Sequence, residues 1–524
     1  MIFNFINSRF FLVFLFPFTL GTLTVFSFQP FNYSFINFFI IPALFLVTTY
    51  VQKKSRNTYR KKPYILNLFL IGYLFGIGFF LTGTSWISNS LTFDESFRFL
   101  IPISVVGFPV FLGIFFGLGN LIIGPFLKNN FTSILLFSSS YAFMDFLRAK
   151  VFTGFPWNLW GYTWSWLPEI LQLLPLIGFF SFNLICIVIY CSPLLLIFQK
   201  KFNFTVFGLI GIIFFGNFIY GSSVIKNNNK YIEQEKLNSK NSIYTKIVSP
   251  GFELKYNLSN DDISKNILKL IKLSEPQAEK KTLFIWPEGA FIGFNLEQIK
   301  QYKSLFEEAF SEDHLILFGI NTIDDSQSIN QIFNSLIVVN NKFDVIYRYN
   351  KIKLVPFGEF LPFNKILSSI GLKKITEGHG SFSPGRKANI FLLGNMRLLP
   401  LICYEIIFPK LSQEQKEKNL IVNITEDAWF GKTIGPHQHF AKAIFRSIEN
   451  NVFLIRSANK GFSAFIDNKG IIKKLLMPNE TGVLELNVPL INNVQKKYKI
   501  DLIFFVLLFT CIFIFIAFKK KKNE

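Results

Sequence analysis

Long apolar runs dominate the first 221 residues and limit what this chain can fold into. A run of roughly 20 apolar residues is long enough to cross a bilayer as a helix. Seven runs of this kind precede residue 222 and an eighth lies near the end of the chain, at about 10–28, 33–51, 65–89, 99–127, 131–147, 171–198, 203–221 and 500–518. The first run lacks a clear small-residue cleavage site and more runs follow it, so it is interpreted as a retained helix. The sequence therefore predicts a polytopic α-helical membrane domain of about eight spans.

The charges between the runs predict an orientation. Basic residues follow the runs with even numbers, namely those of the loop 53–62, Lys128, Lys200, Lys201 and the tail 519–522. The loop 88–97, after the third run, is acidic, whereas Arg148 and Lys150 after the fifth run depart slightly from this pattern. The positive-inside rule places the basic loops and both termini in the cytoplasm. The block 222–498 is then expected on the opposite side of the membrane.

Residues 222–498 have a different character, with frequent charges and short β-rich runs. The predicted strands are 242–248, 282–286, 315–320, 335–339, 345–349, 398–403, 420–424 and 452–457. Helices are expected at 261–273, 297–310 and 438–450, and turn sequences at 340–342, 394–395 and 467–470 predict hairpins. The chain is thus divided into a membrane domain with seven helices (1–221), an α/β domain (222–498), and a last transmembrane helix with a basic tail (499–524).

The overall charge favours membrane topology over nucleic-acid binding. The net charge is +21, and half of the residues are hydrophobic. A basic balance is typical of proteins that bind nucleic acid or anionic lipid. Here the basic residues gather beside the apolar runs, so no nucleic-acid partner is expected.

Cys403 ends an apolar strand in the stretch LPLICYEIIF (399–408), where a tyrosine and a glutamate follow it directly. It is the only cysteine of 222–498, which excludes a disulfide within this domain. A zinc site needs several ligands at suitable spacing, and the histidines offer one close pair, His437 and His439. A buried core position and a nucleophile remain. The glutamate weakens the core interpretation, and a nucleophilic cysteine needs a base.

Two further strand ends carry groups that suit such chemistry. Glu288 lies just beyond the strand of FIWPEGAF (284–291), and Lys351 and Glu359 follow a strand in YNKIKLVPFGEFLP. Each residue alone is most simply a solvated side chain at a strand end. Sites of α/β proteins assemble at strand ends, so three such ends in one domain together predict an active site.

The motifs WPEGA (286–290), YNKIKLVPFGEFLP (349–362) and ICYEI (402–406) occur in the order of the Glu-Lys-Cys triad of the nitrilase superfamily, which they resemble. The stretches FTGFPWNLWGY (152–162) and NITEDAWFGKTIGPHQHFAKAIFRSIE (423–449) resemble the apolipoprotein N-acyltransferase family, as does the order of the domains. The resemblance covers nearly the whole chain. It implies a nitrilase-like αββα sandwich that faces the periplasm, in a multi-pass protein of the bacterial inner membrane.

The resemblance also implies a two-step acyl transfer. A phospholipid donates a fatty acyl chain to the thiol of Cys403, and the thioester then acylates the α-amine of diacylglyceryl-cysteine in an apolipoprotein. Glu288 is expected to be the general base, and Lys351 is expected to stabilise the oxyanion. The supporting residues are Glu359, Tyr404 and Glu405, and the residues expected at the substrate or in a lid are Trp429 and Phe430. No cofactor or metal is expected, and the protein is expected to be a monomer.

Three positions depart from the family pattern. Glu426 stands where Asn is expected, Lys460 where Thr or Asn is usual, and Tyr256 where a Trp is often found. The aromatic segment 152–166, with four tryptophans, is interpreted either as an interfacial belt or as part of a lipid portal.

Two alternatives use the same features differently. A membrane-anchored amidase or nitrilase acting on a small soluble molecule would share the triad, but one anchor helix would suffice for it. A transporter with a soluble domain would carry ionisable residues inside its spans, and Asp145 is the main example here.

Overall fold

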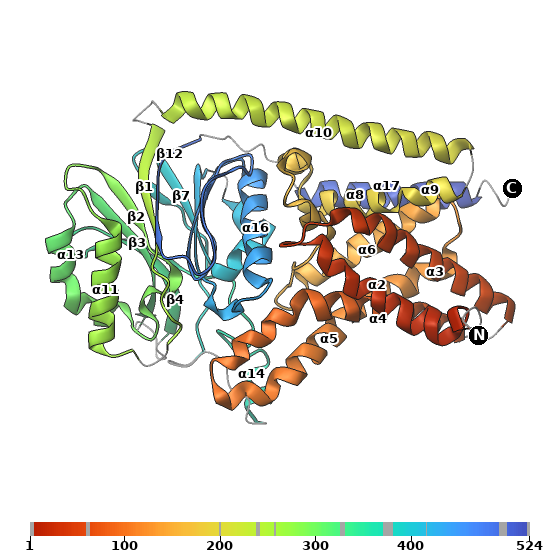
Figure 1. Ribbon diagram of the computed structural model, residues 1–524, viewed down its shortest axis with the longest axis horizontal. Coiled ribbons are helices and arrows are strands. Elements are labelled where there is room, and N and C mark those ends of the chain that lie inside the picture. Colours follow the sequence, from red (N-terminus) through yellow and green to blue (C-terminus); the bar gives the residue numbers. More distant parts are fainter. Residues whose placement is uncertain are drawn as a thin grey trace. The chain divides into compact units, whose positions relative to one another are not determined.

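The computed structural model describes residues 5–58, 63–198, 201–236, 241–255, 258–324, 331–369, 381–415, 417–491 and 500–520. The chain forms two compact units, which are shown in Figure 1. Unit 1 comprises Met1–Val224 and Lys497–Glu524, and unit 2 comprises Ile225–Lys496. Tyr256, one of the three departures from the family pattern, lies outside the described residues.

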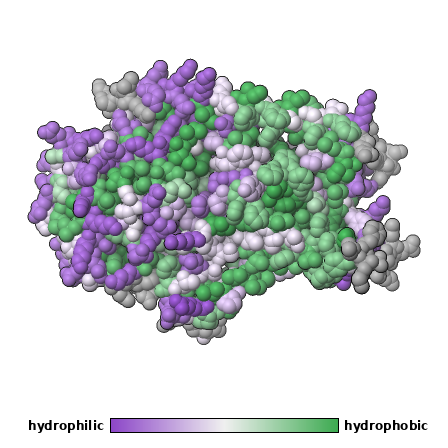
Figure 2. All heavy atoms as spheres, viewed as in Figure 1, coloured by the Kyte–Doolittle hydropathy of each residue, from purple (hydrophilic) through white to green (hydrophobic). Residues whose placement is uncertain are grey.

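Seven segments of the described residues are helical, long and apolar enough to cross a membrane. They are Phe10–Ser27, Ser34–Lys54, Tyr64–Thr92, Glu95–Phe126, Phe179–Ile197, Lys201–Glu235 and Ile500–Lys519. Hydrophobic residues cover the helices of unit 1 in Figure 2, whereas hydrophilic residues are frequent on unit 2. The prediction of a helical domain with several helices that are long and apolar enough to span a membrane is therefore confirmed.

Two of the eight expected runs differ in detail. The run at 131–147 forms the helix α6 (Phe131–Lys150), but its serines and charged residues leave it outside the apolar set. The run at 171–198 is interrupted at Gly178, whose φ of 76° lies in the left-handed region. Short helical turns precede this glycine, and α8 (Phe179–Cys191) and α9 (Pro193–Ile197) follow it.

Small residues allow the helices of unit 1 to approach closely. The helices α2 (Phe16–Leu23) and α4 (Pro63–Thr84) pack together, and α4 also packs against α5 (Ile101–Ile123). A Cβ added to Gly72 of α4 would lie 2.4 Å from the carbonyl oxygen of Phe116 in α5. Close backbone approach of this kind is typical of helix packing in membranes.

Gly72→Ala should therefore destabilise unit 1. The added methyl group meets backbone, which cannot move aside as a side chain can, so α4 and α5 must separate. We expect a loss of about 1–3 kcal/mol, as for other overpacked contacts. Thermal unfolding in detergent measures it. The control is Gly208→Ala in α10 (Lys201–Lys236), where nothing lies within 4 Å of the added Cβ. Equal midpoints for both variants would contradict this account of the packing.

A buried ion pair explains why charged residues end α6. Nη2 of Arg148 lies 2.9 Å from Oδ1 of Asp145, and Asn183 donates to the other oxygen of Asp145 at 3.0 Å. Nη1 of Arg148 also donates to the carbonyl oxygens of Phe155 and Trp157, at 2.6 and 2.8 Å. Asp145 and Arg148 thus neutralise each other and fix the loop that follows α6, which is a structural role rather than part of a transport pathway.

The interfacial-belt interpretation of segment 152–166 is wrong for three of its four tryptophans. Trp157, Trp160 and Trp164 are buried within unit 1, and Trp166 alone of the four is exposed, at 44%. The aromatic residues of the neighbouring helices explain the burial, since the ring of Trp160 lies 5.3 Å from that of Phe79. Packing inside the unit thus outweighs the interfacial preference of these side chains.

Unit 2 is a sandwich of two six-stranded sheets. The first sheet has the order β12-β1-β2-β3-β4-β5 and the second has the order β11-β10-β9-β8-β7-β6. The strands of the first sheet are β1 (Ser242–Ser249), β2 (Thr282–Ile285), β3 (His314–Asp324), β4 (Gln331–Val339), β5 (Val345–Asn350) and β12 (Gly482–Pro489). Those of the second are β6 (Phe391–Leu393), β7 (Met396–Ile402), β8 (Leu420–Glu426), β9 (Phe453–Asn459), β10 (Ser463–Ile466) and β11 (Ile472–Leu476).

Helices cover the outer faces of both sheets. The helices α11 (Asn260–Ser274) and α13 (Lys303–Ala309) pack against the first sheet through a cluster that includes Ile267, Phe306 and Trp286. The helix α16 (Gly435–Asn450) packs against β9 of the second sheet. The expected αββα sandwich is therefore confirmed. The helix expected at 297–310 is broken, with α12 (Leu296–Ile299) and α13 joined by a single 3-10 turn.

Strand direction brings several carboxyl ends to one end of the sandwich. β1, β2 and β3 are parallel, and two antiparallel steps make β5 run in the same direction as β3. In the second sheet, β7, β8 and β9 are also parallel. Oγ of Ser457 in β9 donates to the carbonyl oxygen of Ile285 in β2 at 3.2 Å, so the two sheets meet near these ends. Glu288, Lys351 and Cys403 each follow a strand at this end.

Candidate active site

Lys351 lies directly after β5 and its side chain is buried. Its Nζ lies 2.9 Å from Oε1 of Glu359 and 3.3 Å from Oε1 of Glu288. Burial disfavours the ammonium group, but Glu288 and Glu359 outweigh this effect and hold the pKa of Lys351 above its usual value. The site therefore contains a permanent positive charge between two carboxyl groups.

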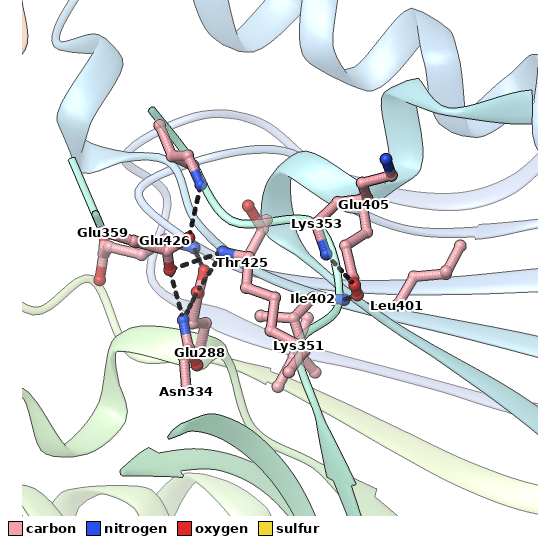
Figure 3. Close-up of polar contacts among 12 residues, drawn as sticks. Glu288, Asn334, Lys351, Lys353, Glu359, Leu401, Ile402, Glu405, Thr425 and Glu426 are labelled. Atoms are coloured by element: carbon pink, nitrogen blue, oxygen red, sulfur yellow. Dashed lines mark hydrogen bonds and ion pairs between the residues drawn. The ribbon is translucent and has the colours of Figure 1, made fainter. Parts of the chain in front are cut away.

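Asn334 of β4 joins the same two carboxyl groups, as Figure 3 shows. Its Nδ2 donates to Oε1 of Glu288 at 2.7 Å and to Oε1 of Glu359 at 2.8 Å. The second oxygen of Glu288 accepts the backbone N–H of Glu426 at 3.0 Å. The orientation of Glu288 is thus fixed from both of its oxygens. Sequence reasoning missed Asn334, which lies one residue before the run expected as a strand at 335–339.

Cys403 stands at the point where β7 turns into the 3-10 helix η12 (Cys403–Ile407). Its φ of 46° lies in the left-handed region, which a residue with a side chain rarely adopts. Such strain persists where the surrounding structure enforces it, and functional sites are common examples. The sharp turn directs the cysteine away from the path of the strand.

The surroundings of Cys403 favour the protonated thiol in the resting protein. Burial, and then the negative charge of Glu288, raise the pKa of Cys403, while Lys351 acts in the opposite direction. The side chain of Thr425, at the end of β8, also lowers the pKa of the thiol, but burial and Glu288 outweigh it. A protonated thiol needs a base before it can attack. Among the carboxylates nearby, Glu288 has the largest effect on the pKa of Cys403.

Glu405 holds the turns after β5 and β7 together. Its Oε1 accepts the backbone N–H groups of Ile352 and Lys353 at 2.7 and 3.1 Å, and its Oε2 accepts that of Ile402 at 2.8 Å. The hydroxyl of Tyr349 donates to both oxygens, at 2.8 and 2.9 Å. Because Lys351 and Cys403 lie next to these N–H groups in the chain, Glu405 sets the spacing between them. Figure 3 shows this second group of contacts beside the first.

Glu405→Gln should lower both stability and activity while leaving Cys403 unchanged. An amide NH₂ would then face N–H groups that now donate to a carboxyl oxygen, and each lost hydrogen bond to a buried group costs about 1–3 kcal/mol. We expect a 10- to 100-fold loss of turnover, in line with about 1.4–2.7 kcal/mol of misplacement. Tyr349→Phe removes one donor but keeps the backbone clamp, so its loss should be clearly smaller. Equal losses would contradict the clamp.

The remaining expected residues lie nearby. Tyr404 is half-buried, and its ring packs 5.1 Å from that of Phe408. Phe430 is buried and lies 5.2 Å from the ring of His439 in α16, which favours a core position over a mobile lid. Trp429 is half-buried in the 3-10 turn η13 (Ala428–Phe430), directly after β8 and Asp427.

A buried polar network lies at the ends of β8 and β9. Oδ2 of Asp427 accepts from Nη2 of Arg456 at 2.8 Å, and Oδ1 accepts from Thr425 at 2.8 Å and lies 3.0 Å from Nδ1 of His439. Burial opposes the charge of Asp427, but Arg456 and His439 outweigh it and lower its pKa to about 2. Burial and Arg456 lower the pKa of His439 to about 4, so the imidazole is neutral at pH 7. Sequence reasoning missed this network, which supports Thr425 beside the thiol.

Both halves of the chain match known families. A model of the apolipoprotein N-acyltransferase N-terminal domain matches residues 20–192, and a carbon-nitrogen hydrolase model matches residues 254–496. The apolipoprotein N-acyltransferase of Brucella melitensis is 30% identical over 478 residues, which cover 90% of this chain and 88% of that protein. This chain belongs to the apolipoprotein N-acyltransferase family. The family member of Rickettsia typhi is 31% identical over 481 residues, with 90% and 91% of the two chains covered.

Membership of the apolipoprotein N-acyltransferase family makes the chain an acyltransferase and a membrane protein. It favours this interpretation over a soluble-substrate amidase and over a transporter. Among solved structures, a cysteine-to-alanine mutant of an amidase from Nesterenkonia AN1, of the nitrilase superfamily, is 15% identical. It covers 50% of this chain and 96% of its own, with a TM-score of 0.36. Within the described residues, no group of three or more His, Cys, Asp or Glu side chains is placed to hold a metal ion.

Proposed function

We propose that this chain transfers a fatty acyl group from a phospholipid to the N-terminal α-amine of a diacylglyceryl apolipoprotein, through a thioester on Cys403. One observation carries the proposal. The buried ammonium of Lys351 contacts the carboxyl groups of Glu288 and Glu359, and this cluster acts on the charge of Cys403. A base, an oxyanion-stabilising cation and a thiol are the groups that acyl transfer through a thioester requires.

The first step forms the acyl-enzyme. Glu288 takes the thiol proton, and Sγ of Cys403 attacks the ester carbonyl carbon of the phospholipid. Negative charge develops on the carbonyl oxygen, where Lys351 stabilises it. The bond to the glycerol oxygen then breaks, and Glu288 returns the proton to this oxygen. The lysophospholipid leaves, and the acyl chain stays on sulfur.

The second step consumes the acyl-enzyme. The neutral α-amine of the acceptor attacks the thioester carbonyl carbon, and Glu288 takes a proton from the attacking nitrogen. The carbon–sulfur bond breaks, the thiolate of Cys403 takes the proton back from Glu288, and the amide product leaves. The same carboxylate, held by Asn334 and by the N–H of Glu426, serves both steps without moving.

The membrane unit fits lipid substrates better than it fits a small soluble substrate. Each CH₂ group of an acyl chain that leaves the bilayer for water costs about 0.8 kcal/mol, so the acyl donor and the diacyl acceptor must both be met at the membrane. A single anchor helix would suffice for an amidase acting on small molecules. Seven apolar helices fit an enzyme that works on lipids inside the bilayer.

The acceptor distinguishes the proposed reaction from hydrolysis. Purified protein in phospholipid vesicles should acylate a synthetic diacylated lipopeptide that has a free α-amine. The same lipopeptide with an N-acetylated terminus should give no product, because its nitrogen cannot attack. Rapid hydrolysis of short soluble amides, together with equal behaviour of the two lipopeptides, would instead support the amidase alternative.

The charge pattern of the loops supports a multi-pass arrangement in the inner membrane, with unit 2 in the periplasm and both termini in the cytoplasm. Cysteine labelling tests this orientation. Glu308→Cys, on the exposed side of α13, should react with a membrane-impermeant maleimide in cells with a permeabilised outer membrane. Lys519→Cys, near the end of α17 (Ile500–Lys520), should react only after lysis. The reverse pattern, after subtraction of the unsubstituted chain, would contradict the orientation.

A further inference from the structure

Glu426 occupies a position next to the proposed base that the mechanism above uses only through its backbone. Its backbone N–H donates to Oε2 of Glu288, and its own side chain is buried, with 3% of the residue exposed. A Cβ added to Gly289 would lie 1.7 Å from Oε2 of Glu426. The carboxyl group therefore packs against the turn η10 (Glu288–Phe291) that carries the base.

The partners of this carboxyl group are uncharged. Oε1 accepts the backbone N–H of Ala428 at 3.0 Å, and Oε2 accepts Nδ2 of Asn459 at 2.8 Å. The amide of Asn459 cannot turn to offer its oxygen instead, because that oxygen accepts the N–H of Phe252 at 2.7 Å. A buried carboxylate with two neutral donors lacks the compensation that an ion pair provides.

The titratable groups of this part of the site have partners other than Glu426. The charged ones are Glu288 on η10, Asp427 after β8, Arg456 on β9 and Lys351 after β5, whereas His439 on α16 is neutral at pH 7 and the thiol of Cys403 on η12 is protonated. Lys351 pairs with Glu288 and Glu359, and Arg456 pairs with Asp427. The two acidic neighbours of Glu426 therefore act on it more directly than the cations do.

We propose that Glu426 is a positioning residue for the catalytic base, which holds Glu288 and its turn while its carboxyl group is protonated and weakens the site when that proton is lost. The inference rests on the proposed role of Glu288. An ionised Glu426 would place a second negative charge beside the base, which disfavours both the thiolate of Cys403 and the oxyanion of the transition state. Burial, then Glu288 and Asp427, raise the pKa of Glu426 to about 8 against its two hydrogen-bond donors.

The pH dependence of Cys403 reactivity tests this role without any lipid. Wild type, Glu426→Gln and Glu426→Asn are treated with iodoacetamide between pH 6.5 and pH 9, and mass spectrometry follows the peptide that contains Cys403. Relative to wild type, both uncharged variants should react more rapidly as the pH rises. We expect the ratio of the variant rate to the wild-type rate to grow about three- to tenfold from pH 6.5 to pH 9. This growth corresponds to a thiol pKa that is about 0.5 to 1 lower in the variants than in wild type once Glu426 is ionised.

Two comparisons keep this test independent of folding and of the acyl-transfer proposal. Glu308→Gln, the same substitution on the exposed side of α13, should follow wild type at every pH. A merely structural role would change the rates of the Glu426 variants by the same factor at every pH, so a constant ratio would overturn the inference. In wild type alone, a plot of log rate against pH should flatten near pH 8, and a straight line of unit slope would also overturn it. Because no lipid is used, these results stand apart from any failure of acyl transfer.

Discussion

Cys403→Ala should abolish acyl transfer, with a loss of about 10⁴-fold or more, because the proposed acyl-enzyme forms on the thiol that this substitution removes. The fold should remain, since the methyl group of alanine fits where the larger CH₂–SH group lies. The measurement is transfer of a labelled acyl chain from phospholipid to a lipopeptide. Cys403→Ser should also form no detectable thioester and little ester, because a hydroxyl is a far weaker nucleophile than a thiol at neutral pH.

The matched control for this prediction is Cys511→Ala in α17. Cys511 is another free, partly buried cysteine, and it lies in an apolar helix of unit 1, whereas the Glu288 cluster belongs to unit 2. Its replacement should leave acyl transfer near the wild-type value. Transfer by Cys403→Ala within tenfold of wild type would remove Cys403 from the mechanism and leave the cluster without a nucleophile.

Lys351→Met should cost both stability and catalysis. The variant leaves the buried carboxyl group of Glu359 and the partly buried one of Glu288 without their cation, and breaking a buried ion pair in this way typically costs about 3–5 kcal/mol. Loss of the positive charge that we propose to stabilise the oxyanion should lower turnover by a further 10²- to 10³-fold. Denaturation in detergent and the acyl-transfer assay measure the two effects separately.

Lys342→Met provides the comparison for Lys351. Lys342 is exposed in the hairpin between β4 and β5, at the opposite end of β5 from Lys351. The same substitution there should change stability by less than about 0.5 kcal/mol, as is usual at exposed positions. Unchanged activity in Lys351→Met would contradict the role proposed for the ammonium group, whatever its effect on stability.

The sequence predicted the sandwich because its strands are locally distinctive. All eight apolar runs expected as strands form strands, and the turn sequences at 340–342, 394–395 and 467–470 lie in hairpins. The weakest segments were missed. β12 pairs with β1, far earlier in the chain, and its alternation of Leu, Leu and Val with Glu and Asn has no nearby partner to confirm it. Such pairings depend on contacts between distant segments, which a local pattern does not contain.

In the membrane unit, the sequence predicted the helices but not their interruptions or the contacts between them. Apolar length predicted where helices lie, but it could not show where a run is interrupted. Gly178 divides one expected run because its left-handed backbone suits a glycine and because its position leaves no room for a Cβ, which would lie 1.8 Å from Cγ2 of Ile500. The pairing of Arg148 with Asp145, and with two loop carbonyls, likewise depends on a fold that brings the loop back onto α6.

The sequence predicted which residues of the site follow strands, but it could not predict the contacts between their side chains. Glu288, Lys351 and Glu359 were expected near one another because each follows a predicted strand, and the structure brings them within hydrogen-bond distance. Asn334 lies one residue before the strand predicted at 335–339, so it was not considered, although it bridges both carboxyl groups. Glu426 was recognised only as an unusual residue, since its contact with Glu288 joins the two sheets.

A single-turnover experiment tests the central claim most directly. Purified protein is mixed with vesicles of labelled phospholipid and no acceptor, and both lysophospholipid release and the mass of the Cys403 peptide are followed. The account predicts a burst of about one lysophospholipid per enzyme, followed by almost no further release. The peptide that contains Cys403 should then carry the mass of the acyl group, because the thioester is not consumed until an amine attacks it. Addition of the lipopeptide should then discharge the thioester and restart turnover. Steady lysophospholipid release without acceptor, or acyl-lipopeptide formation with no acyl group ever found on Cys403, would contradict it.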